Sequence, residues 1–290
     1  MANLAKNDHI ITLKDGRKLG YSEFGDPKGK PLLYFHGWPT SRLMATETGI
    51  VAKVIGVRVI SIDRPGYGLS DYQKNRTLLD WADDVIELAD QLKMKKFAVM
   101  GVSGGGPYAA VCAYKIPNRV TKAGIVVGLA PTYVPGILKG MSKLSQLGWA
   151  NYAKFPVLRT SSALFHFFNA RFGPSLGLHR FMFGAKADQK IFSDVNIRKR
   201  IRRNYQESFR NGYKGVELDL KLYTNDWGFK LSDIKSKVLL FYGADDKNVG
   251  IVMGKYYASQ IKNSKLTIYP GEGHLCRINH EEEILKALTS

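Results

Sequence analysis

The chain has 290 residues, of which 44% are hydrophobic and 23% are charged. These values are close to the average for globular proteins and exclude a disordered, collagen-like or coiled-coil chain. At about 150 residues per domain, the length allows one large domain or two smaller ones. No apolar stretch approaches the roughly 18 residues that are needed to span a bilayer.

The amino terminus and the cysteines predict a cellular compartment. Residues 1–8 are too polar to form the apolar stretch of a signal peptide. Cys112 and Cys276 cannot form a disulfide framework and do not have the spacing of a metal site. We therefore expect a cytoplasmic protein without a bound metal or cofactor.

The net charge of +18 is distributed unevenly. Residues 91–187 contain no Asp or Glu and hold 13 Lys or Arg residues, so this stretch carries most of the excess. The charge could serve solubility, or it could attract acidic substrates or an anionic membrane surface. Nucleic acid is not an expected partner, because no helix-turn-helix, zinc-finger or RNA-binding signature accompanies the basic residues.

The first predicted elements are two strands, at residues 9–13 and 18–24, which flank an Asp-Gly pair typical of a hairpin turn. Short apolar strands are then expected at 31–35, 57–62, 97–100, 122–127, 238–242 and 266–269. Helices are expected between or after them, at 41–55, 78–92, 108–116, 250–261 and 281–288. Such alternation predicts an α/β fold with a parallel sheet covered by helices on both faces.

The alternation stops at about residue 133 and resumes at about 229. We expect residues 133–228 to form a helical cap inserted into a core domain of residues 1–132 and 229–290. Within the cap, residues 196–210 place Ile197, Ile201, Tyr205 and Phe209 at four-residue steps with basic residues between them. This pattern predicts an amphipathic helix whose basic face is simply solvated, or makes a weak contact with an anionic membrane surface or an acidic partner.

The predicted strand at 97–100 leads into Gly101-Val102-Ser103-Gly104-Gly105, and a predicted helix follows. A G-x-S-x-G motif between a strand and a helix is typical of a nucleophile elbow, in which Ser103 is exposed and the Gly104 N–H faces a developing oxyanion. The alternative is a glycine-rich helix start that tightens packing or holds a phosphate. The segment lacks both the P-loop lysine and the G-x-G-x-x-G spacing that such sites use.

A nucleophilic serine needs a base and a carboxylate that orients it. Among six histidines, His274 follows the last predicted strand, at the sheet edge where open parallel sheets place their sites, although a solvated loop histidine is the alternative. The preceding strand ends in Gly243-Ala244-Asp245-Asp246, which gives the order serine, acid, histidine. We favour Asp246 as the acid over Asp245.

A second oxyanion donor is expected in the loop after the strand at 31–35. Gly37 permits a tight turn there, and the Trp38 N–H could face the substrate oxygen beside the Gly104 N–H. The ring of His36 is expected to hold this loop through hydrogen bonds, without transferring protons.

Five segments together resemble the α/β-hydrolase superfamily, in its capped, esterase-like serine branch. They read HGWPTSR at 36–42, DRPGYGLS at 63–70, GVSGG at 101–105, GADD at 243–246 and GEGH at 271–274. The resemblance implies an eight-stranded, mostly parallel sheet with a helical lid after the sixth strand. It also implies a Ser103–Asp246–His274 triad with oxyanion donors at Trp38 and Gly104. The segment at 63–70 is similar to a family loop that shapes a turn near the site, and we assign no chemistry to Asp63 or Arg64.

The resemblance implies cleavage of carboxylic esters through an acyl-enzyme on Ser103. Activity is expected to decline as His274 protonates below about pH 6.5. Related dehalogenases and epoxide hydrolases carry aspartate at the position of Ser103, which argues against both activities. A cap this basic also argues against the substrate amines that iminopeptidase-like relatives hold with cap carboxylates. Small to medium acyl esters or lactones, some with an anionic group, are therefore the expected substrates.

Several cap phenylalanines are expected mostly to form the cap core, with some lining an acyl pocket; they are Phe165, Phe167, Phe168, Phe172, Phe181 and Phe183. Two alternative functions stay open. One is a small-molecule receptor on a hydrolase scaffold with slow turnover. The other is a cofactor-free peroxidase or a C–C bond hydrolase that uses the same residues.

Overall fold

A computed structural model describes residues 7–173 and 184–290 of the chain. Its centre is an eight-stranded sheet in the order β1-β2-β4-β3-β5-β6-β7-β8. The β1–β2 and β2–β4 pairs are antiparallel and the remaining pairs are parallel, so the expected fold class is confirmed. The strands are β1 (Asp8–Thr12), β2 (Lys18–Gly25), β3 (Lys30–Phe35), β4 (Val57–Ile62), β5 (Phe97–Val102), β6 (Val120–Val126), β7 (Val238–Gly243) and β8 (Ser264–Tyr269).

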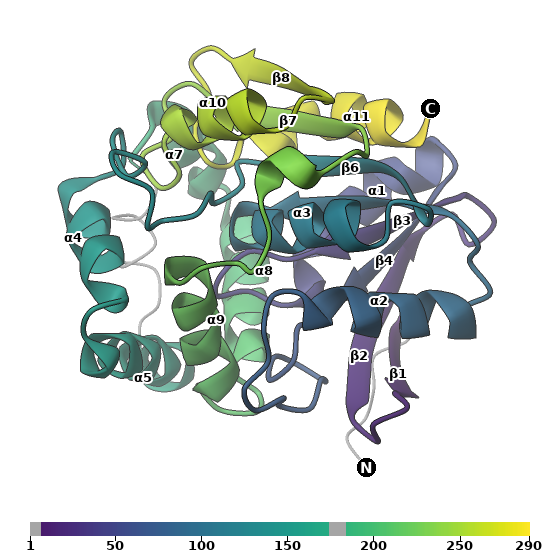
Figure 1. Cartoon of the computed structure of the whole chain (residues 1–290), viewed down its shortest axis with the longest axis horizontal. Helices are drawn as coiled ribbons and strands as arrows, with labels where there is room; N and C mark the ends of the chain where they lie inside the picture. The colour runs from purple at the N-terminus through teal and green to yellow at the C-terminus, as the bar shows by residue number, and fades with distance from the viewer. Residues whose placement is uncertain (1–6, 174–183) are drawn as a thin grey trace.

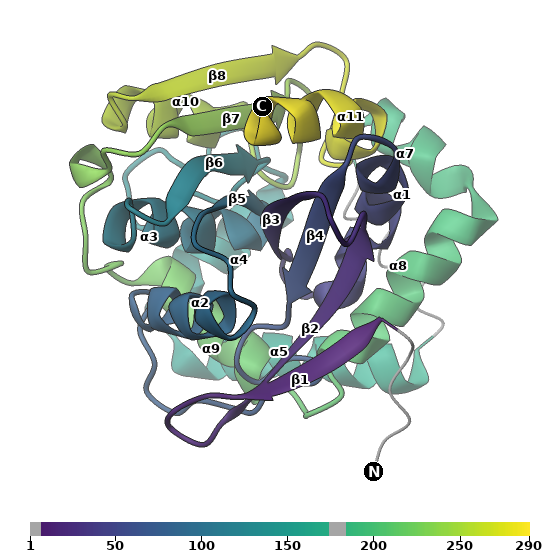
Figure 2. The same ribbon diagram turned by 90° about the vertical axis from the view of Figure 1, so that its right-hand side faces the viewer.

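The central strands are apolar along their whole length because helices cover the sheet on both sides. Every residue of β5 and of β7 is buried. On one side the core is formed with α2 (Asp80–Gln91), α3 (Gly106–Lys115) and α10 (Ile251–Gln260). On the other side it is formed with α1 (Thr46–Val54) and α11 (Cys276–Thr289), as Figure 2 shows for α1, α2, α3 and α11.

Two predicted helices differ from the observed ones by more than two residues at one end. The helix predicted at 41–55 is a short 3-10 helix, Arg42–Ala45, followed by α1. The last helix begins at Cys276, five residues before the predicted start, and has non-helical backbone angles at His280. The first turn of this helix contains polar residues, which an apolar pattern cannot identify as helical. One of them, Arg277, is nevertheless buried.

Five helices with described residues lie between β6 and β7, beyond the carboxyl ends of the central strands (Figure 1). They are α4 (Lys143–Tyr152), α5 (Pro156–Phe172), α7 (Lys186–Ser193), α8 (Val195–Ser208) and α9 (Lys214–Thr224). We call residues 133–228 the helical insertion, since this is the segment for which the sequence predicts a cap. Its status as a separate domain stays a prediction. Phe181 and Phe183 lie outside the described residues.

The expectation for the cap phenylalanines is wrong for Phe168 and Phe172, whereas Phe167 packs against a buried cluster of the helical insertion and Phe165 lines a cavity. Phe165, Phe168 and Phe172 are 55%, 54% and 75% exposed. Helix α5 instead turns small residues inward, because Ala163 and Ala170 pack with Tyr67, Tyr205, Phe209 and Val216.

In the described part of the chain, no helix combines the length and the apolar composition needed to cross a bilayer.

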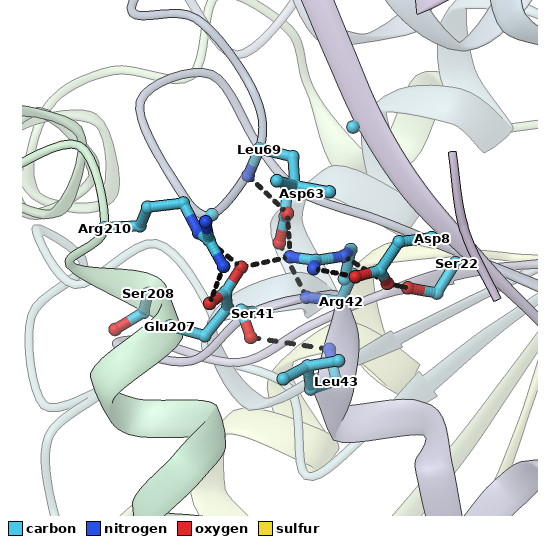
Figure 3. Close-up of polar contacts among 12 residues, drawn as sticks. Asp8, Ser22, Ser41, Arg42, Leu43, Asp63, Leu69, Glu207, Ser208 and Arg210 are labelled. Atoms are coloured by element: carbon cyan, nitrogen blue, oxygen red, sulfur yellow. Dashed lines mark hydrogen bonds and ion pairs between the residues drawn. The ribbon is translucent and has the colours of Figure 1, made fainter. Parts of the chain in front are cut away.

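A buried arginine links the helical insertion to the sheet through ion pairs. Arg42 is 1% exposed, and its guanidinium binds Asp8 in β1 at 2.7 Å, Asp63 after β4 at 2.8 Å and Glu207 on α8 at 2.7 Å (Figure 3). Next to it, the Ser41 N–H donates to the Asn204 side chain of α8 at 2.7 Å. The loop after β3, which carries Trp38, is therefore held between the sheet and α8.

Candidate active site

Ser103 stands at the sharp turn between β5 and α3. Its φ of +54° lies in the left-handed region, which a residue with a side chain adopts only under strain. A Cβ atom on Gly101 would overlap the Gly105 carbonyl oxygen, and one on Gly105 would overlap the Phe35 carbonyl oxygen. Glycine is therefore required two residues on either side of Ser103, because the backbone passes too close for any side chain.

The predicted histidine and acid lie beside this serine. Nε2 of His274 is 3.0 Å from Oγ of Ser103, and Nδ1 of His274 is 2.7 Å from Oδ2 of Asp246. The other oxygen of Asp246 accepts hydrogen bonds from the N–H groups of Asn248 and Val249, at 2.7 and 3.0 Å. The three side chains meet because the parallel strands β5, β7 and β8 end at the same edge of the sheet.

The choice between the two neighbouring aspartates is decided by burial. Asp246 is 2% exposed and contacts the histidine ring. The side chain of Asp245 is exposed to solvent, and its backbone N–H donates to the carbonyl oxygen of Glu272 at 2.9 Å. The geometry thus brings Asp246, and not Asp245, behind His274.

A second carboxylate, which the sequence analysis missed, contacts the loop of His274. Asp188 on α7 accepts hydrogen bonds from the backbone N–H groups of His274 and Leu275, at 2.8 and 2.7 Å. It is 1% exposed and stands 86 residues from His274 in the chain. The one available signal was that Asp188 is the first carboxylate after the acid-free stretch, and this signal does not reveal its contact.

The charges around His274 change the pH at which its side chain is expected to become protonated. Burial lowers the pKa of this histidine, but Asp246 and then Asp188 raise it more, so that it lies above the ordinary value of 6.5. His274 therefore becomes protonated at a higher pH than an ordinary histidine does.

The backbone amides of Trp38 and Gly104 lie close together beside Ser103. A Cβ atom on Gly104 would lie 3.0 Å from the Trp38 amide nitrogen, so the two segments are in contact. Gly104 lies in the first turn after β5, where N–H groups have no intrahelical acceptor. Within residues 7–173 and 184–290, the Trp38 N–H makes no hydrogen bond either. The Trp38 indole donates to the Val216 carbonyl oxygen on α9 at 3.0 Å, which fixes its orientation.

His36 holds the loop after β3, which carries Trp38, through hydrogen bonds. Its Nδ1 lies 2.9 Å from the Gly37 carbonyl oxygen, and its Nε2 accepts the Arg64 N–H at 3.3 Å. Burial and the neighbouring Arg64 hold the pKa of His36 well below its ordinary value. The ring is therefore a neutral structural element, in line with the expectation from the sequence.

Beneath the same loop lies a buried network around Asp219 of α9, to which the sequence analysis assigned no role. The Asp219 carboxylate binds Arg64 at 2.8 Å and also pairs with Arg76. Burial alone would raise the pKa of Asp219, but these two guanidinium groups lower it to about 2. The Tyr223 hydroxyl lies 2.9 Å from the Gly104 carbonyl oxygen and 3.1 Å from Asp219.

Arg64 extends this network to the loop that carries Trp38. Its guanidinium donates to the carbonyl oxygens of His36 and, at 3.1 Å, of Gly37. Helix α9 of the helical insertion is thereby connected, through Arg64 and Tyr223, to both loops that carry the Trp38 and Gly104 amides.

A cavity of about 620 Å³ adjoins the hydroxyl of Ser103. The helical insertion contributes much of its wall, and its side chains there are largely apolar: Leu144, Trp149, Tyr152, Phe165, Ile197 and Ile201. Two arginines also line it, and each is paired with a carboxylate: Arg200 with Glu47 at 2.5 Å, and Arg277 with Glu281. In the described ranges, no group of three or more His, Cys, Asp or Glu side chains could hold a metal ion.

Comparisons with known proteins agree with the observed fold. Residues 30–280 match the family model described as the alpha/beta hydrolase fold. The chain is 27% identical over 283 residues to a bifunctional esterase/perhydrolase of Acinetobacter calcoaceticus, covering 96% of this chain and 97% of that protein. It is 27% identical over 274 residues to a non-heme haloperoxidase of Rhodococcus erythropolis, covering 93% and 94%. A solved hydrolase structure from Pseudomonas aeruginosa is similar in fold, with a TM-score of 0.74 at 18% identity, covering 98% and 99%.

Proposed function

The chain belongs to the alpha/beta hydrolase fold family, and we propose that it is a serine hydrolase that cleaves carboxylic esters through an acyl-enzyme on Ser103. The observation that carries this proposal is the unbroken hydrogen-bond chain from the Ser103 hydroxyl through His274 to Asp246. This is the arrangement that activates serine for attack on carbonyl carbon.

In the proposed reaction, His274 Nε2 takes the proton of Ser103 as Oγ attacks the ester carbonyl carbon. Asp246 keeps the other ring proton on Nδ1 and stabilises the imidazolium that forms. The Trp38 and Gly104 N–H groups donate to the oxyanion, and each such donor contributes roughly 3 kcal/mol to lowering the barrier. The alcohol leaves with the proton from His274, and water then releases the acid by the same base.

The cavity supports small to medium acyl groups as substrates. Its volume of about 620 Å³ is in the range of pockets that enclose small organic molecules. Because Arg200 and Arg277 are each paired with a carboxylate, the wall offers less attraction to an anionic group than the basic sequence suggests. Apolar esters and lactones therefore fit this cavity better than charged ones.

Perhydrolysis is a second candidate, which the esterase/perhydrolase and haloperoxidase relatives favour. Here hydrogen peroxide replaces water as the acceptor of the acyl group. His274 takes a proton from the peroxide, the peroxide oxygen attacks the acyl carbon, and a peracid leaves as Ser103 recovers its proton. Formation of peracid from ester and hydrogen peroxide, compared with simple hydrolysis, separates the two activities.

The decisive experiment combines turnover with active-site labelling. A series of p-nitrophenyl esters of increasing acyl length should be hydrolysed, and a fluorophosphonate should label Ser103. The Ser103→Ala variant should stay folded and lose both, whereas Ser145→Ala, which removes another serine from the cavity wall, should keep both. Full esterase activity in Ser103→Ala would overturn the proposal, and labelling without turnover would favour the small-molecule receptor.

A further inference from the structure

We propose that the outer face of α4 and α5 binds the surface of an anionic lipid bilayer. This docking face consists of large apolar side chains that are between 45% and 76% exposed: Leu144, Leu147, Phe155, Val157, Leu158, Phe165, Phe168 and Phe172. Soluble proteins rarely expose so many large apolar groups together unless they meet a partner or a membrane.

The exposed side chains follow one side of α5. Val157, Phe165, Phe168 and Phe172, with Ser161 between the first two, are spaced by three or four residues, which places them along a single face of a helix. The opposite face carries the buried Arg159, Ala163 and Ala170. Helix α5 thus turns Val157, Phe165, Phe168 and Phe172 to solvent, while Phe167 packs inward. At about 1.5 Å per residue, its 17 residues make a stripe long enough to lie along a membrane surface.

The positive charge around the docking face favours an anionic bilayer as its binding partner. Helices α4 and α5 and the loop between them contain no Asp or Glu, whereas Lys143, Lys154 and Arg171 are exposed there. Basic residues near an anionic lipid surface are attracted to it, and apolar side chains that enter the headgroup region add to the binding. Dimerisation of two chains through this face is less favourable, because it would bring like charges together.

The docking face is continuous with the cavity. Leu144 and Phe165 belong to the face and also line the cavity that holds Ser103. Helices α4 and α5 form one end of the molecule, remote from β1 and β2 (Figure 1). A bilayer bound at this end would meet the rim of the cavity, and, if the proposed ester hydrolysis is correct, a lipid-soluble ester could enter without crossing water.

Vesicle co-sedimentation tests the binding without reference to turnover. The Ser103→Ala variant is mixed with vesicles of phosphatidylcholine alone, or with vesicles in which about one third of the lipid is phosphatidylglycerol. We expect binding to the anionic vesicles, weakening as salt rises, and little binding to the neutral ones. Replacing Phe168 and Phe172 together by serine should weaken vesicle binding about tenfold or more, since each loses apolar area that would leave water.

A matched control is available on another surface. Ile50 and Val54 of α1 are 67% and 85% exposed, and replacing both by serine should leave vesicle binding unchanged. In the presence of the native Ser103, the Phe168→Ser and Phe172→Ser changes should not alter hydrolysis of a short, water-soluble ester, because neither residue lines the cavity. This activity control reports on the proposed function separately from membrane binding.

Three results would overturn the proposal. The first is equal binding to neutral and anionic vesicles, or none to either. The second is anionic-vesicle binding that the phenylalanine changes do not weaken. The third is a dimer in sedimentation equilibrium that these changes dissociate, without vesicle binding, which would assign the face to a second copy of the chain.

Discussion

Asp188 on α7 accepts a hydrogen bond from the backbone N–H of His274 at 2.8 Å, so the helical insertion is bonded directly to the loop of the proposed catalytic base. The same carboxylate raises the pKa of His274, together with Asp246. Asp188 is thus placed to act on the base in two ways, through the position of its loop and through its charge.

Replacing Asp188 by asparagine should shift the pH dependence of activity. In the native chain, His274 must be neutral to act as a base, so activity should fall as the pH drops through a pKa above 6.5. Loss of the Asp188 charge lowers this pKa, and the acidic limb of the kcat/KM profile should move to lower pH. The measurement is a pH–rate profile with a soluble ester.

Asp245→Asn is the matched control, because Asp245 is exposed and adjoins Asp246 without contacting the histidine. Its profile should coincide with that of the native chain. If Asp188→Asn lowered activity equally at every pH, Asp188 would only support the fold of the loop, and its electrostatic role would be refuted.

Replacing Tyr223 by phenylalanine should lower kcat about fivefold with little change in KM, since a lost hydrogen bond costs roughly 1 kcal/mol and here frees the Gly104 segment. The hydroxyl it removes lies between the Gly104 carbonyl oxygen and Asp219. Steady-state kinetics with one ester would measure both constants.

Tyr242→Phe separates positioning from stability in the Tyr223 experiment. Tyr242 is equally buried, and its hydroxyl donates to the Gly128 carbonyl oxygen at 2.7 Å and not to the Gly104 segment. Both variants should lose a similar free energy of unfolding, but only Tyr223→Phe should lose kcat. Equal kinetics in the two variants would contradict a positioning role for Tyr223.

Replacing Arg42 by methionine should destabilise the fold strongly. Arg42 is the shared partner of Asp8, Asp63 and Glu207, and its removal leaves these carboxylates close together with little water (Figure 3). Removing one partner from a buried ionic group costs about 3–5 kcal/mol, which urea unfolding would measure.

Arg58→Met provides the comparison for Arg42, because Arg58 pairs with Glu23 where the two side chains are 22% and 24% exposed. The free energy of unfolding should fall by less than about 1 kcal/mol there. A small effect at both positions would show that the Arg42 cluster does not fasten the helical insertion to the sheet.

Much of the fold could be predicted from the sequence because local rules govern it. The apolar runs of the buried strands and the intervening helical patterns placed all eight strands of the sheet. Ser103 could be identified because a strained turn imposes glycine at 101 and 105, a requirement of the backbone that is visible in the sequence itself. His274 could be identified because it directly follows a strand whose carboxyl end faces the site.

Contacts between distant segments were decided only by the tertiary structure. Asp245 and Asp246 are the same residue type at neighbouring positions, and it is the burial of Asp246 behind the His274 ring that distinguishes them. Asp188 acts across 86 residues, and the Arg64–Asp219 pair spans 155, so no local pattern could have joined either pair. The direction in which α5 turns Phe165, Phe168 and Phe172 also followed from its neighbours, which accept alanines at close range and leave these three rings exposed.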